Sequence, residues 1–266
     1  MKRTLLTLAA VLFFVAPAFA QDWAKQTLEK SPRHREWVAV KNGDRTVNAF
    51  VVYPEVNHPA PVIIVIHEIF GLTDWVETVA DKLAENGYIA IAPDLLSGLG
   101  PNGKGSPDFT SQTDVGRAIQ GLPPDQITAD LNAVADYGKK LPSANGKLAV
   151  TGYCWGGGQS FRFATNRKDL SAAFVFYGVT PPAASLANIT APVYGFYAEN
   201  DNRITGSIPA TTEAMKAAGK KYDPVVYAGA GHGFMRAGED PTNTNAANVT
   251  AHDQAWTRWL TLLKSM

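Results

Sequence analysis

Residues 147–158, KLAVTGYCWGGG, decide the fold. Their apolar first half predicts a buried strand, and the glycines that follow predict a sharp turn into a helix over about residues 155–165. The pattern Gly152-x-Cys154-x-Gly156 matches the strand-turn-helix elbow that presents a nucleophile, with cysteine in place of serine. Glycine on either side of the nucleophile lets the strand and the helix pack closely. A helix that begins behind the sulfur offers backbone N–H groups to a thiolate or an oxyanion.

Short apolar runs on both sides of this elbow predict further strands that are buried on both faces. These runs are 62–66, 88–92, 148–150, 172–177 and 193–197, with a last short strand at 225–227. Residues 37–40 and 47–52 alternate more and predict edge strands in a hairpin around Asn42-Gly43. Helical patterns cover 75–85, 127–141, 207–218 and 249–263. This alternation predicts one α/β domain over residues 21–266, with a mostly parallel central sheet and helices on both faces.

Residues 1–20 predict a cleavable signal peptide. Lys2 and Arg3 precede an apolar run, and residues 18–20 (Ala-Phe-Ala) have the form of a cleavage site before Gln21. The run is about half the ~20 residues that a membrane span needs. We therefore expect a periplasmic or secreted protein that makes no membrane contact after cleavage.

The overall composition excludes several other classes of function. The 266 residues hold 24 basic and 24 acidic side chains, so no basic excess predicts nucleic-acid binding. Cys154 is the one cysteine, which excludes an intramolecular disulfide; a small buried hydrophobe is its alternative role. The histidines are scattered, and Gly156–Gly158 lacks the Lys-Ser/Thr ending of a phosphate loop. We expect no metal, no cofactor and a monomer.

A nucleophile at this elbow needs an acid and then a histidine later in the chain. His232 lies between glycines just after the last predicted strand, where a structural role is hard to explain. His252 falls on the apolar stripe of the last helix, which indicates packing. Glu199 and Asp201 follow the strand at 193–197, and we favour Asp201 because it lies further into the turn. An ordinary turn aspartate is the alternative.

Four motifs together resemble the dienelactone hydrolase family over residues 38–263. They are 67–72 (HEIFGL), 152–157 (GYCWGG), Asp201 and 232–236 (HGFMR). The resemblance implies an α/β-hydrolase fold and hydrolysis of a small ester or lactone through a thiol acyl-enzyme. The alternatives are an exported carboxylesterase of another substrate range and a non-catalytic binding protein that keeps the fold.

The resemblance also implies the roles of individual residues. Cys154 is the nucleophile, His232 the base and later the acid, and Asp201 the carboxylate that orients His232. The backbone N–H groups of Ile69 and Trp155 form the oxyanion hole.

In the family, a carboxylate at the position of Glu68 contacts the resting neutral thiol, and substrate binding shifts it so that the thiol is deprotonated. A solvated loop carboxylate is the alternative for Glu68. Arg236 binds the carboxylate of the substrate by resemblance, with Phe70 nearby, or else makes a surface ion pair. The segment 97–124 is a candidate lid, and its Arg117 is a further candidate for substrate binding. Arg117 does not stand where the family has its lid arginine, so the ester hydrolase chemistry is better supported than dienelactone as the substrate.

Overall fold

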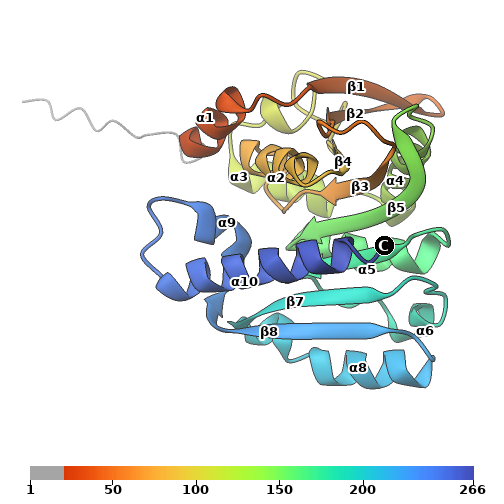
Figure 1. Cartoon of the computed structure of the whole chain (residues 1–266), viewed down its shortest axis with the longest axis vertical. Helices are drawn as coiled ribbons and strands as arrows, with labels where there is room; N and C mark the ends of the chain where they lie inside the picture. Colours follow the sequence, from red (N-terminus) through yellow and green to blue (C-terminus); the bar gives the residue numbers. More distant parts are fainter. Residues whose placement is uncertain (1–20) are drawn as a thin grey trace, which may run out of the picture.

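The computed structural model describes residues 21–266, which form an eight-stranded sheet with helices on both faces (Figure 1). The predicted signal peptide, residues 1–20, lies outside the described residues. The strands are β1 (Arg35–Asn42), β2 (Arg45–Val52), β3 (Ala60–Ile66), β4 (Ile89–Pro93), β5 (Ala144–Tyr153), β6 (Ala172–Phe176), β7 (Val193–Asn200) and β8 (Tyr222–Gly231). Their order across the sheet is β1-β2-β4-β3-β5-β6-β7-β8. Because β2 runs antiparallel to β1 and β4 while the other neighbours are parallel, the sheet is mostly parallel, as predicted.

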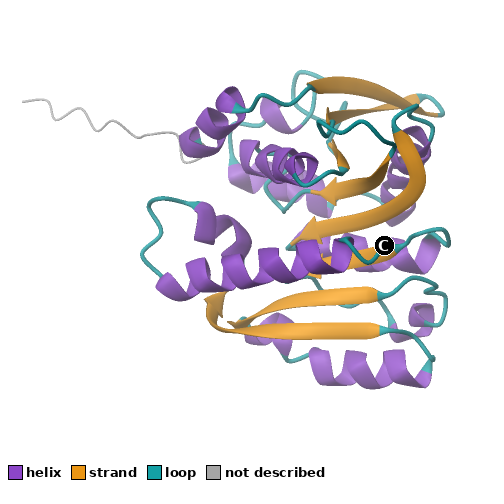
Figure 2. Ribbon diagram, viewed as in Figure 1, coloured by secondary structure: helices purple, strands orange, loops and turns teal. Residues whose placement is uncertain are grey.

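Helices cover both faces of this sheet. They are α1 (Asp22–Lys30), α2 (Asp74–Glu85), α3 (Gln112–Gln120), α4 (Pro124–Lys139), α5 (Trp155–Asn166), α6 (Ala183–Leu186), α7 (Asn202–Thr205), α8 (Ile208–Ala217), α9 (Phe234–Glu239) and α10 (Ala246–Leu263). One face packs against α1, α2, α9 and α10, and the other against α3, α4, α5 and α8 (Figure 2). No helix within residues 21–266 is long and apolar enough to cross a membrane.

Strand β3 shows why continuous apolar runs predict this arrangement. Val62 and Ile64 enter one hydrophobic core, whereas Ile63 and Val65 enter the other. Successive side chains of a strand point to opposite faces, so a strand covered on both faces needs apolar residues at every position.

The structure departs from the predicted elements where local pattern carries little information. Strand β8 continues to Gly231, because its backbone pairs with β7 up to the contact of Gly231 with Asn200. Helix α1 was not predicted, and α3 forms inside the segment 97–124 that was expected to be a loop. The hairpin turn is Gly43-Asp44, one residue later than predicted.

The segment 97–124 is fastened to the core near its middle. The hydroxyl of Ser106 donates to the buried carboxylate of Asp94 at 2.7 Å and accepts the backbone N–H of Leu72 at 2.9 Å. Movement of this segment is therefore restricted on both sides of residue 106.

Side chains of the last helix brace the short helix α9. Glu239 of α9 is 5% exposed and binds Lys82 of α2 at 2.7 Å and His252 of α10 at 2.9 Å. His252 therefore packs between helices, as its position on the apolar stripe indicated. Asn248 of α10 accepts the backbone N–H of Gly231 at 2.9 Å, which ties the end of β8 to the same helix.

Candidate active site

The elbow between β5 and α5 places Cys154 at the carboxyl edge of the sheet. Cys154 has φ 54° and ψ −115°, a conformation that costs free energy for a residue with a side chain. The glycines around it permit this turn by close backbone contact. A Cβ on Gly152 would lie 2.0 Å from the carbonyl oxygen of Gly156, and one on Gly156 would lie 2.3 Å from that of His67. Helix α5 thus begins directly behind a partly exposed thiol.

The structure brings His232 and Asp201 together, although they lie 31 residues apart. His232 follows β8, and its Nδ1 donates to Oδ2 of Asp201 at 2.5 Å. Asp201 is 8% exposed, so this carboxylate is largely removed from water. Glu199, the alternative acid, instead accepts the backbone N–H of Gly229 at 2.8 Å and supports the loop that carries the histidine.

His232 also faces Cys154, and its charge state depends on both neighbours. Burial lowers the pKa of the imidazole, but hydrogen bonds to Cys154 and Asp201, together with their negative charges, raise the pKa to about 9. This value includes the negative charge of a Cys154 thiolate, so it describes His232 once the thiol has lost its proton.

Glu68 is buried and bound to Arg236. Its Oε2 accepts the Nε–H of Arg236 at 2.7 Å, and its side chain is 3% exposed, which excludes the solvated loop carboxylate considered as an alternative. Burial raises the pKa of Glu68, and Arg236 offsets this only in part. Arg236 also lies over the ring of Phe70, 5.2 Å from its centroid. The three residues form one cluster beside the elbow.

A pocket with a volume of about 330 Å³ opens at Cys154. Its lining is Ile69, Gln120, Cys154, Trp155, Gln159, Tyr177, Val179, Arg203 and Ile204. Trp155 is the first residue of α5, where a backbone N–H has no acceptor within the helix. The ring of Trp155 stacks on buried His67, which also hydrogen-bonds the backbone oxygen of Glu68, so His67 has a packing role.

Four polar residues of this pocket were not predicted from the sequence: Gln120, Gln159, Tyr177 and Arg203. Three residues predicted to bind substrate are absent from its lining: Phe70, Arg117 and Arg236. Tyr177 and Arg203 come just after β6 and β7, and the carboxyl ends of parallel strands are the signal that could have found them. Gln159 gave no such signal, because it lies within α5. Arg117 is not in the pocket lining: its side chain is 74% exposed and pairs with Asp114 on α3.

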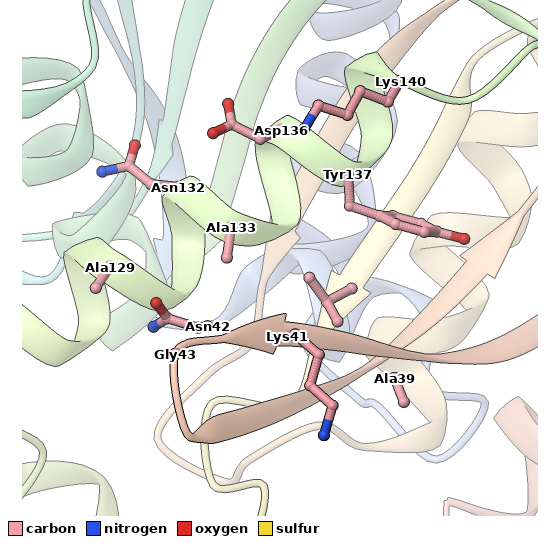
Figure 3. Close-up of a pocket in the computed structure, with 11 residues that line it drawn as sticks. Ala39, Lys41, Asn42, Gly43, Ala129, Asn132, Ala133, Asp136, Tyr137 and Lys140 are labelled. Atoms are coloured by element: carbon pink, nitrogen blue, oxygen red, sulfur yellow. The ribbon is translucent and has the colours of Figure 1, made fainter.

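A larger groove, of about 620 Å³, lies between β1 and α4 (Figure 3). Its lining includes Lys41, Asn132, Asp136 and Tyr137 and none of the residues predicted for catalysis. The smaller pocket is the candidate active site, because Cys154, the predicted nucleophile, lies there.

The fold and the position of the elbow define the class of protein. A mostly parallel sheet with a nucleophile elbow after β5, an acid after β7 and a histidine after β8 is the α/β-hydrolase arrangement. The sequence model of the Dienelactone hydrolase family matches residues 47–266. The chain belongs to this family and is a dienelactone hydrolase-like ester hydrolase.

Individual relatives agree with this assignment. A carboxymethylenebutenolidase homologue of Escherichia coli (strain K12) is 34% identical over 192 residues, covering 66% of this chain and 68% of the relative. A 2-oxo-3-(5-oxofuran-2-ylidene)propanoate lactonase homologue of Bradyrhizobium is 25% identical over 242 residues, covering 86% of this chain and 93% of the relative. The crystal structure of a dienelactone hydrolase homologue from Klebsiella pneumoniae superposes with a TM-score of 0.78 at 24% identity, covering 88% and 99% of the two chains.

The elbow geometry predicts that Gly156→Ala destabilises the protein. The added Cβ would meet backbone oxygens of Ile66 and His67 at 2.4 and 2.3 Å, so α5 must shift. We expect the free energy of unfolding to fall by about 1–3 kcal/mol, measured by urea denaturation.

Gly116→Ala is the matched control, because it lies within α3 and its Cβ would meet only Ile69, at 3.7 Å. It should leave stability unchanged or raise it by up to about 1 kcal/mol. Equal unfolding midpoints for the two variants would contradict the close-packed elbow.

Proposed function

We propose that this protein hydrolyses small lactones or carboxylic esters through a Cys154–His232–Asp201 triad and a thioester intermediate. The observation that supports this most strongly is the His232–Asp201 hydrogen bond beside a cysteine in strained backbone geometry. These three residues occupy the chain order of the α/β-hydrolase triad, with sulfur in place of the serine oxygen.

In the proposed acylation step, the thiolate of Cys154 attacks the carbonyl carbon of the substrate. The backbone N–H groups of Trp155 and Ile69 stabilise the oxyanion that forms. Beside the Cys154 thiolate His232 is protonated, and it donates its proton to the leaving oxygen as the carbon–oxygen bond breaks. Neutral His232 then takes a proton from the water that attacks the thioester. The carbon–sulfur bond breaks, the acid product leaves, and the Cys154 thiolate regains its proton from Glu68. We therefore infer that His232 acts first as acid and then as base, the reverse of the order that the family resemblance implied; its raised pKa supports this order.

Glu68 is the proposed acceptor of the thiol proton. Its raised pKa makes it a better base than an ordinary carboxylate. Arg236 holds Glu68 in place, and a substrate carboxylate that reached Arg236 would compete for the same guanidinium and release Glu68. Thiol deprotonation would then depend on bound substrate. Such control suits an exported enzyme, since a permanent thiolate is exposed to oxidation.

The substrate class follows from the relatives and from the pocket volume of about 330 Å³, which suits a small molecule. One relative is named for a lactone that carries a carboxylate. A carboxylesterase of broader range is the second candidate, because Arg117 lies on the surface, outside the pocket.

The triad predicts loss of activity by about 10,000-fold in kcat for Cys154→Ala and for His232→Ala, since neither half of the reaction can proceed normally. Rates on an aryl ester would measure this. Acid quenching during turnover, followed by mass spectrometry, should find the acyl group on the Cys154 peptide. Glu68→Gln should reduce the acylated fraction while the protein remains folded. Near-normal turnover by Cys154→Ala would exclude the thiol mechanism.

The raised pKa of His232 predicts an alkaline limit to activity. Below about pH 9 the imidazole is protonated and can supply the leaving oxygen with a proton. We expect kcat to fall as the pH rises through about 9, because kcat follows the ionisation of the enzyme–substrate complex, in which Cys154 is a thiolate. Asp201→Asn removes a negative neighbour and should move this limit to lower pH. A kcat that continued to rise above pH 9 would instead indicate neutral His232 as the initial base.

We propose that the protein is exported and that cleavage occurs before Gln21. The basic start, the apolar run and the small residues at 18 and 20 support this. The mass of the protein recovered from a periplasmic extract should equal that of residues 21–266. An uncleaved chain confined to the cytoplasm would contradict export.

A further inference from the structure

The pocket beside Cys154 has a charged group that the triad does not use. Arg203 lies in α7, two residues after the acid Asp201, and forms part of the pocket lining. The backbone oxygen of Asp201 accepts the N–H groups of Ile204 and Thr205, both at 2.9 Å. The turn that positions the acid therefore also positions Arg203 at the pocket.

Arg203 differs from most arginines of this chain in having no partner. Within residues 21–266 its exposed guanidinium has no hydrogen bond or ion pair. Carboxylates pair with Arg33, Arg45, Arg117, Arg167, Arg236 and Arg258. Arg236 is bound to Glu68 and is not part of the pocket lining, so among the described residues Arg203 is the one lysine or arginine of that lining.

The rest of the lining favours a ligand with both an apolar and a polar part. Most of the pocket surface comes from apolar or aromatic side chains: Ile69, Trp155, Tyr177, Val179 and Ile204. Gln159 adds a side-chain oxygen that is buried without a hydrogen-bond partner. An amide oxygen only accepts, so an N–H or O–H group of a ligand, and not its carboxylate, would supply the missing partner.

We propose that Arg203 binds an anionic group of the substrate, so that esters and lactones with a carboxylate beyond the scissile carbonyl are the preferred class. The proposal rests on the proposed function of this site and adds a specificity residue to it. In this proposal the second cation that binds the substrate is Arg203 of α7, and not Arg117 of the segment 97–124. A planar guanidinium suits this role because it can bind both carboxylate oxygens at once.

The test compares two aryl esters that differ in one charge. The 4-nitrophenyl ester of hexanoic acid is neutral, and the mono-4-nitrophenyl ester of adipic acid has the same number of acyl carbons and ends in a carboxylate. Arg203→Gln should lower kcat/KM for the adipate ester about tenfold, mainly through KM, which is about 1.4 kcal/mol of binding. The hexanoate rate should stay within about twofold. Arg203→Lys should retain part of the preference, since it keeps the charge and loses the planar fork.

Lys216→Gln is the control for net charge, because Lys216 is an exposed residue of α8 outside the pocket lining. It should leave both rates unchanged. An equal effect of Arg203→Gln and Lys216→Gln would overturn the proposal in favour of long-range attraction. An equal loss on both esters would assign Arg203 a structural role. Unchanged rates on both esters would exclude a role for Arg203 in substrate binding. Failure of the proposed function would look different, because Cys154→Ala would then hydrolyse both esters as the unchanged protein does.

Discussion

The close approach of α5 to the ends of β3 and β5 is the constraint on which the site depends. At Gly152 and Gly156 backbone meets backbone with no room for a Cβ, and this contact holds Cys154 in its strained turn. The backbone N–H of Cys154 also donates to the carbonyl of Phe176 at 3.0 Å, so the turn is tied to β6 as well. A strained backbone conformation persists at Cys154 only because the packing around it permits no other conformation.

The other functional groups come to the elbow from separate loops at one edge of the sheet. Glu68 follows β3, Asp201 follows β7 and His232 follows β8. Parallel strands end at the same edge, so residues that are distant in the chain converge there without long connections. The carboxylates of Asp201 and Glu68 have different surroundings. Asp201 stabilises the protonated histidine, whereas Glu68 is buried with a raised pKa and its own guanidinium.

Local patterns were sufficient to predict the sheet, the elbow and the triad candidates, because each depends on a short run of residues. The apolar run at 62–66 and the glycines around Cys154 and His232 are signals of this kind. The pairing of Glu68 with Arg236 spans 168 residues and has no local signal. Arg117 was placed by its position in a loop, but that segment forms a helix that turns the side chain to solvent. Which arginine reaches the pocket depends on tertiary structure.

The brace on α9 has a consequence for handling the protein. Asn248 and His252 of α10 hold the end of β8 and Glu239, and the loop with His232 lies between these two anchors. The carboxyl terminus is itself packed, since the backbone oxygen of Met266 accepts Nζ of Lys147 at 2.5 Å. Trimming the last helix would therefore loosen the loop that carries His232. An affinity tag placed at this end sits on a helix that the loop carrying His232 depends on.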